Sequence, residues 1–251
     1  MKCSQNRAAL GYILDSRGLF EYNRGINPTR KGRSSDMTGY RKIDMEHWPR
    51  REHYAYYTQK LKIEYNITAR VQVDRFLHFC HEKGYRFYPA LICVVTGVMN
   101  QLENFRMFRN GEGELCVWDH VVPNYTFFHQ DDKTFSDCWS EPSDDFDTFY
   151  HTITADMDRY RDVKGIKVRP DQPANFYCIS CDPWTDFTGF SSRLTNGEPQ
   201  FFPIVTIGRY VEERGKTTMS VGLMAAHAVC DGYHAGLFFT ALQKALDEIG
   251  Q

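Results

Sequence analysis

The last part of the chain limits the fold most strongly. Residues 219–226 form an apolar run, and residues 235–249 carry apolar side chains at i, i+4, i+7 and i+11 from Phe238. The run predicts a buried strand, and the second spacing predicts an amphipathic helix with one apolar face. Only residues 227–234 separate the two. A short strand-to-helix connection of this kind is typical of a sheet that is covered by helices.

This connection also carries groups that suit proton transfer. His227 follows the predicted strand, Asp231 comes four residues later, and Gly232 stands beside the aspartate. A strand end holds an imidazole rigidly, the glycine permits a tight turn, and the carboxylate can fix the local geometry. The spacing His-x-x-x-Asp-Gly therefore indicates a general base, although a structural histidine is the alternative interpretation of the motif alone.

The composition is that of an ordinary globular protein. Of 251 residues, 42% are hydrophobic and 25% charged, which allows one large domain or two small ones. A net charge of -2 gives no electrostatic reason to expect a nucleic acid or an acidic membrane as partner. The aromatic content of 15% favours a large core, a subunit interface or an apolar pocket. No stretch approaches the length of a transmembrane helix.

The eight cysteines do not predict a metal site. Cys178 and Cys181 form one C-x-x-C, but structural zinc would need a second such pair or a nearby histidine pair. The pair also falls in a strand-like run, where alternation directs the two thiols to opposite faces. We therefore expect no metal and interpret the cysteines as small hydrophobic residues in a reducing cytosol.

The first residues differ from the rest of the chain. Residues 1–36 are basic and rich in Gly, Asn and Ser, and their apolar run at 8–14 is too short and poorly flanked for a signal peptide. We expect residues 1–36 to be a poorly ordered N-terminal extension and residues 37–251 to be a single domain. Deleting residues 1–36 should then leave activity and thermal stability intact.

The remainder alternates irregularly between predicted helices and strands. Helices are expected from residue 44, from a cap at Asp74 to a stop at Gly84, from Pro89, and over 144–160 and 235–249. Strands are expected over 60–66, 69–73, 176–179, 187–190 and 203–211, with a hairpin over 111–128 and a final strand after a turn at 212–216. Without a regular β-α-β order, the pattern predicts an α+β domain with a mixed sheet covered by helices.

Several blocks of sequence together resemble one enzyme family. Besides HAVCDGYH at 227–234, they are WPRREH at 48–53, RFYPA at 86–90, ENFRM at 103–107, Asp119, YT at 125–126, FS at 135–136, WSE at 139–141, SCDPW at 180–184 and TIGRY at 206–210. From Thr38 onward the chain resembles the chloramphenicol acetyltransferases. The resemblance implies their fold, that of the CoA-dependent acyltransferases.

The resemblance also implies an activity and roles for five residues. It implies a cytoplasmic bacterial homotrimer with active sites at subunit interfaces, which moves the acetyl group of acetyl-CoA to the 3-hydroxyl of chloramphenicol. Acetyl-CoA is a co-substrate, and no cofactor is bound permanently. His227 matches the general base, Ser180 the hydroxyl that stabilises the oxyanion, and Thr206 the threonine that holds an ordered water. Asp231 matches an aspartate that pairs with an arginine, here Arg50, to hold the histidine loop in place.

Binding residues follow from the same resemblance. Family positions in the drug pocket fall on Tyr57, Leu61, Tyr65, Asn124, Thr126 and Phe135. Contacts with CoA fall on Trp184, Arg86, Arg209 and Tyr210, where arginine replaces the lysine of the family at two positions. The chain departs from the family at Ala226, where many members carry a first histidine, and at Ile63, a pocket position often held by cysteine.

Two other functions are compatible with the motif. A CoA-dependent acyltransferase could act on another acceptor, as the dihydrolipoamide acyltransferase cores do with the same His-x-x-x-Asp-Gly. A non-catalytic trimer could instead sequester an apolar ligand, although the joint presence of His227, Ser180, Thr206, Arg50 and Asp231 argues against it. Cys230 also raises the possibility of a Cys-His nucleophile, but the family transfers the acetyl group directly.

Overall fold

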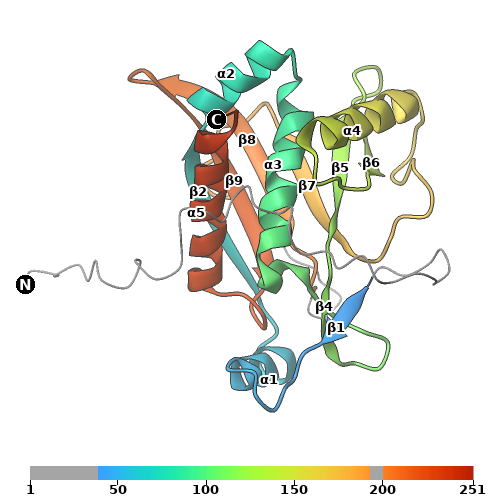
Figure 1. Cartoon of the computed structure of the whole chain (residues 1–251), viewed down its shortest axis with the longest axis vertical. Coiled ribbons are helices and arrows are strands. Elements are labelled where there is room, and N and C mark those ends of the chain that lie inside the picture. Colours follow the sequence, from blue (N-terminus) through green and yellow to red (C-terminus); the bar gives the residue numbers. More distant parts are fainter. Residues whose placement is uncertain (1–38, 193–199, 251) are drawn as a thin grey trace, which may run out of the picture. The chain divides into compact units, whose positions relative to one another are not determined.

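The computed structural model describes residues 39–192 and 200–250. At their centre lies a six-stranded sheet (Figure 1). Its order is β2 (Glu64–Gln72), β9 (Lys216–Ala226), β8 (Ile204–Glu213), β7 (Phe176–Asp182), β5 (Val122–Phe128) and β6 (Phe135–Trp139). β7 runs parallel to β5 and to β8, and the other neighbours are antiparallel. This confirms the predicted α+β class with a mixed sheet.

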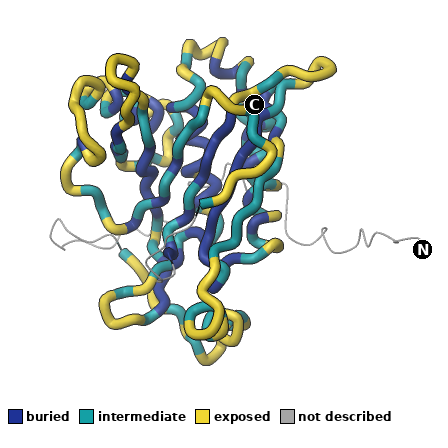
Figure 2. Tube along the Cα trace, turned by 180° about the vertical axis from the view of Figure 1, so that it is seen from behind, coloured by how far each residue is buried: buried dark blue, intermediate teal, exposed yellow. Residues whose placement is uncertain are grey.

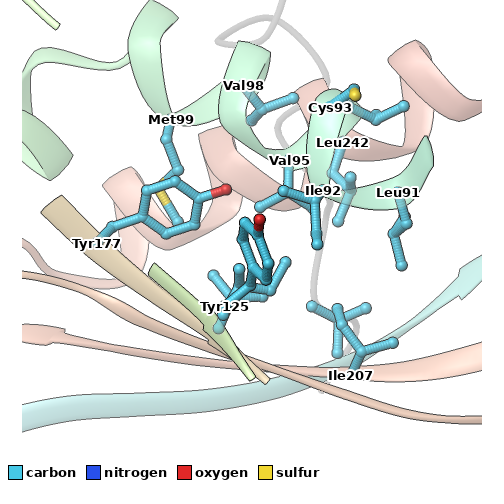
Figure 3. Packing of buried hydrophobic residues seen from close by; sticks show 14 of the residues in the cluster. Leu91, Ile92, Cys93, Val95, Val98, Met99, Tyr125, Tyr177, Ile207 and Leu242 are labelled. Atoms are coloured by element: carbon cyan, nitrogen blue, oxygen red, sulfur yellow. The ribbon is translucent and has the colours of Figure 1, made fainter. Parts of the chain in front are cut away.

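Helices cover one face of this sheet. They are α2 (Asp74–Lys83), α3 (Phe87–Gln101), α4 (Phe146–Tyr160) and α5 (Gly232–Glu248) (Figure 1). Helix α3 is buried along most of its length, as expected of a helix that is apolar on nearly all sides. Tyr125 and Tyr177 extend from the sheet toward Ile92 and Val95 of this helix (Figure 3). The buried Tyr177 hydroxyl is satisfied by a 2.8 Å hydrogen bond with Thr96.

The opposite face of the sheet has no helix of the described ranges in front of it (Figure 2). Along β7, Tyr177 and Ile179 are fully buried in the core, so Cys178 and Ser180 point to this open face. The irregular segment 183–192 crosses part of the face. Arg70 of β2 forms a 2.6 Å ion pair with Asp186 of this segment.

A second, three-stranded sheet lies at one end of the domain. Its order is β1 (Tyr40–Lys42), β4 (Leu115–Trp118) and β3 (Met107–Arg109), and β3 follows the 3-10 helix η1 (Glu103–Arg106). Phe108 and Trp118 stack at 3.7 Å between ring centroids, and Tyr40 packs edge-on against both rings. Aromatic pairs of this geometry help to stabilise so small a sheet.

The expected helix from residue 44 begins later than predicted. Residues 45–50 form turns, with the Asp44 carboxylate accepting from the Glu46 amide at 3.1 Å, and α1 covers Arg51–Gln59. Asp74 is the first residue of α2 rather than its cap, and its carboxylate instead accepts from the Thr217 amide at 2.8 Å. The predicted stop at Gly84 is confirmed, because this glycine has the left-handed φ of 66°.

Three strand predictions were wrong. The two strands expected at 60–66 and 69–73 are one strand, β2, because its pairing with β9 continues from Glu64 to Gln72. The expected hairpin at 111–128 is instead formed by β3 and β4, and β5 joins the large sheet. Residues 187–190 form no strand, since the Phe190 amide bonds the Thr68 hydroxyl across the open face instead of a strand backbone.

The predicted extension at residues 1–36 lies outside the described residues. Within the part that the structure describes, no helix combines the length and the apolar character that crossing a membrane requires.

Candidate active site

His227 stands directly after β9, with both ends of its loop fixed. Its amide donates to the Ile63 carbonyl at 3.2 Å, and its ring Nδ1 lies 2.9 Å from the Cys230 carbonyl oxygen. Because a carbonyl can only accept, Nδ1 must carry the proton, which leaves the lone pair of Nε2 free. Tyr57 stacks on the imidazole at 4.0 Å, and Tyr65 lies 5.3 Å away. These contacts fix the orientation of the ring. In the neutral tautomer that they favour, the proton is on Nδ1 and the lone pair is on Nε2.

Asp231 acts on the loop rather than on the imidazole. It forms an ion pair with Arg50, whose other amino group lies 3.5 Å from the His227 carbonyl. The same carboxylate caps α5 by accepting from the Tyr233 amide at 3.0 Å. Burial raises the pKa of Asp231, but hydrogen bonds from Arg50 and His234 outweigh this effect and lower it to about 2. The structure thus brings Arg50 and Asp231 together as a clamp on the loop.

Two further groups hold the loop, and sequence reasoning missed both. His234 Nδ1 lies 2.8 Å from Asp231 Oδ1, and burial lowers the pKa of His234 although the carboxylate raises it. Asn104 donates to the Val229 carbonyl at 2.7 Å. The position of His234, three residues after a capping aspartate, is a signal that could have revealed its role, because that position completes a capping box. The Asn104 contact spans distant parts of the sequence and left no local signal.

Cys230 is poorly suited to be a nucleophile. Its side chain is fully buried, and burial together with the neighbouring Asp231 charge raises the pKa of the thiol to about 12. A thiol that stays protonated attacks a thioester poorly. The described cysteines are all free, and residues 39–192 and 200–250 contain no group of three or more metal-ligating side chains.

Ser180 and Thr206 lie side by side on the open face of the sheet. They are register partners on β7 and β8, and Thr206 is in turn opposite Gly222 of β9. Gly222 precedes His227, the residue directly after β9, by five positions, which correspond to about 16 Å, and two strand spacings add about 10 Å sideways. Ser180 and His227 of one chain are therefore about 19 Å apart, too far for both to contact one reacting carbonyl.

The comparisons with known proteins identify the family. The family model described as chloramphenicol acetyltransferase matches residues 38–243. The chain belongs to the chloramphenicol acetyltransferase family. A chloramphenicol acetyltransferase of Clostridium perfringens is 35% identical over 202 residues, which cover 80% of this chain and 92% of the relative. The family is one of acyltransferases, as predicted.

Solved structures agree with this fold. A structure described as chloramphenicol acetyltransferase superposes with a TM-score of 0.71 at 19% identity, covering 84% of this chain and all of the other. A structure of the Azotobacter vinelandii dihydrolipoamide acetyltransferase, which addresses the role of a serine, a histidine and an asparagine in its catalytic mechanism, gives 0.58 at 14% identity, covering 74% and 82%. At these identities the likeness concerns the fold.

The drug-pocket residues expected from the chloramphenicol acetyltransferase family fall into two groups. Tyr57 and Tyr65 contact His227, and Leu61 is exposed just before β2. Asn124 and Thr126 of β5, with Phe135 of β6, lie instead on the sheet face that carries Ser180. Asn124 is opposite Cys178 in the register, two positions from Ser180. The structure does not bring the two groups together within one chain.

The residues expected to bind CoA in this family gather around one corner of the large sheet. Arg86 precedes α3, and the neighbouring Phe87 lies 5.3 Å from the Tyr210 ring on β8. The Arg209 amide donates to the Thr185 carbonyl at 3.0 Å, next to Trp184. A β-bulge between Ile207 and Tyr210 sets this corner apart from the regular strand. Trp184 is 60% exposed and is therefore available to a ligand.

Proposed function

We propose that this protein transfers the acetyl group of acetyl-CoA to the 3-hydroxyl of chloramphenicol and so inactivates the antibiotic. Family membership supports the reaction, and the observation that carries the mechanism is the 2.9 Å contact of His227 Nδ1 with the Cys230 carbonyl. In the neutral ring, that contact places the proton on Nδ1 and the lone pair on Nε2. Because the reaction consumes acetyl-CoA, we expect it to take place in the bacterial cytoplasm.

The proposed reaction needs only two chemical steps. Nε2 of His227 takes the proton of the 3-hydroxyl while the hydroxyl oxygen attacks the thioester carbonyl, which becomes a tetrahedral oxyanion. The Ser180 hydroxyl donates to that oxyanion, and Thr206 holds a water nearby. The intermediate then collapses to the acetyl ester, and the departing thiolate of CoA takes the proton from the imidazolium. The Arg50–Asp231 pair keeps the imidazole in position throughout.

The proposed site requires two chains. The separation of about 19 Å between Ser180 and His227 within one chain supports a site in which one copy contributes the base and another the oxyanion donor. A homotrimer in which the open sheet face of each subunit meets the histidine loop of the next would provide three such sites. Tyr57 and Tyr65 would then face Asn124, Thr126 and Phe135 of the adjoining subunit across the drug.

The test follows the release of CoA thiol from acetyl-CoA with chloramphenicol as acceptor. Wild-type protein should release thiol in proportion to the acetylated drug, and His227→Ala should lower kcat by about 10²–10⁴. His78→Ala removes an exposed imidazole on α2 and serves as the matched control, which should keep full activity. Turnover only with another alcohol or with dihydrolipoamide would support the alternative acceptor. Binding of the drug without turnover would support sequestration.

A further inference from the structure

A charged cluster lies on the open face among the residues assigned to the drug pocket. The Lys167 ammonium lies 2.7 Å from Asp137 Oδ2, 2.9 Å from Gln172 Oε1 and 3.4 Å from Asn124 Oδ1. Asn124 completes the cluster by donating to the same Asp137 oxygen at 3.3 Å. The proposed reaction does not use Asp137, Lys167 or Gln172.

The backbone fixes this cluster to the edge of the sheet. The Asp137 amide donates to the Ile166 carbonyl at 2.6 Å, and the Val168 amide donates to the Asp137 carbonyl at 3.2 Å. These two bonds attach residues 166–168 alongside β6, so the position of the Lys167 backbone is not free to change. Asp137 is mostly buried at 15% side-chain exposure, whereas Lys167 is 51% exposed. The anion is thus covered, and the cation still meets solvent.

The strand register places the cluster close to the proposed reaction centre. Asp137 is opposite Thr126, and Asn124 is opposite Cys178, which precedes Ser180 by two positions on the same face. One strand spacing and two residues correspond to about 8 Å between Asn124 and Ser180. Phe135 and Trp139 flank Asp137 on this face. A pocket for an apolar drug would be expected to have an apolar wall there, and this chain has an ion pair.

We propose that Lys167 is a specificity-determining residue that binds an oxygen-rich substituent, such as an aryl nitro or sulfonyl group, at the unreactive end of the acceptor. This inference rests on the proposed function. The ammonium has three protons, and only two of them have short contacts within the protein. The remaining contact, 3.4 Å from Asn124 Oδ1, is long, and an acceptor oxygen can replace it. Asp137 holds the ammonium and balances its charge.

The test compares three acceptors that share the same 3-hydroxyl. They are chloramphenicol, its para-methylsulfonyl counterpart and its unsubstituted phenyl counterpart. In Lys167→Met, kcat/KM should fall about 10-fold for the nitro and sulfonyl acceptors through KM, while the phenyl acceptor keeps its value. Lys167→Arg preserves the charge and should retain most of the preference. Lys164→Met is the matched control, because Lys164 pairs with the exposed Asp131 and Asp132 and should not affect the preference.

Equilibrium dissociation constants of the same three acceptors, measured by calorimetry, separate the two proposals. If the wild type binds the acceptors but does not acetylate them, the proposed function fails, and the ratio of dissociation constants in Lys167→Met still decides the role of Lys167. An equal loss for all three acceptors, or a lower melting temperature with unchanged preference, would show that the ion pair is structural. If no acceptor binds to the wild type, both proposals are wrong.

Discussion

At the scale of single residues, Asp231 combines two functions that depend on its negative charge. It pairs with Arg50, and it caps α5 through the Tyr233 amide. Asparagine at this position would keep a good capping oxygen but lose the charge. Asp231→Asn should therefore lower the free energy of unfolding at pH 7 by about 1–3 kcal/mol, because Arg50 loses its counter-charge in a half-buried site.

The pH dependence of this effect has a definite sign. Since the pKa of Asp231 is about 2 in the folded protein and 3.8 ordinarily, its stabilisation is present above about pH 4 and is lost as the pH falls toward 2. The difference in melting temperature between wild type and Asp231→Asn, measured by differential scanning fluorimetry, should shrink over that range. Asp162→Asn, at an exposed position just after α4, is the control. A difference that stays constant down to pH 2 would contradict the assigned pKa.

Ser180 tests the proposed oxyanion contact. Ser180→Ala removes one hydroxyl from a strand position on the open face and leaves the backbone register with Thr206 intact. Loss of one oxyanion donor should lower kcat by about 10²–10³ with little change in the dissociation constant of the drug. Steady-state kinetics and equilibrium binding of chloramphenicol measure the two quantities. A change confined to the dissociation constant would mean that Ser180 contacts the bound drug instead.

At the scale of elements, the segment 183–192 depends on glycines in the strands beneath it. A Cβ added at Gly208 would lie 3.0 Å from the Phe187 ring and 3.2 Å from the Thr185 carbonyl. Gly208→Ala should displace the segment, lower the stability by about 1–3 kcal/mol and raise KM for acetyl-CoA more than KM for chloramphenicol, because Trp184 belongs to the same segment. Thermal unfolding and steady-state kinetics test this.

The matched control is a glycine with open space around it. Gly236 lies on the exposed side of α5, and apart from its chain neighbours and the adjacent helix backbone no described heavy atom stands within 4 Å of a Cβ added there. Gly236→Ala should keep both KM values and leave the protein equally stable or slightly more stable. Equal effects of the two substitutions would show that the contacts at Gly208 do not position the segment.

Elements with a strong local pattern could be predicted from the sequence, and those set by distant contacts could not. α5 follows from its apolar spacing, and α2 ends where Gly84 adopts a left-handed conformation. Residues 187–190 alternate like a strand, but their Phe187 and Phe190 side chains lie over Gly208 and Gly222 of the sheet, and the Phe190 amide bonds the Thr68 side chain instead of a strand backbone. The three residues of β1 carry too weak a pattern to be recognised. Their partner strand β4 is also distant in the sequence, since Tyr40 pairs with Trp118.

The candidate site shows the same division. His227, Asp231 and Gly232 are close in sequence, so their spacing alone indicated a functional loop. Arg50, Ser180 and Thr206 are far from it in the chain, and only the resemblance to a family pointed to them. The ion pair of Asp137 with Lys167 departs from an apolar pocket, and the cluster around it arises from a backbone bridge between distant segments. No periodicity reports such a bridge.

At the scale of the whole molecule, the proposed site can be tested by mixing two inactive variants. His227→Ala retains Ser180, and Ser180→Ala retains His227. If each site combines a base from one chain with an oxyanion donor from the next, an equal mixture of the two chains in randomly assembled trimers restores about one quarter of the sites. Co-expressed and co-purified chains should then show about a quarter of the wild-type kcat per site.

The variants purified separately provide the baseline, and light scattering coupled to size-exclusion chromatography should give the mass of a trimer for all samples. Mixing the purified variants without dissociating them should restore nothing, because subunits of a stable trimer do not exchange rapidly. If the two groups instead reached each other within one chain, every site in the mixture would lack one of them, and activity would stay at the baseline. The separation of about 19 Å between Ser180 and His227 within one chain favours the shared site.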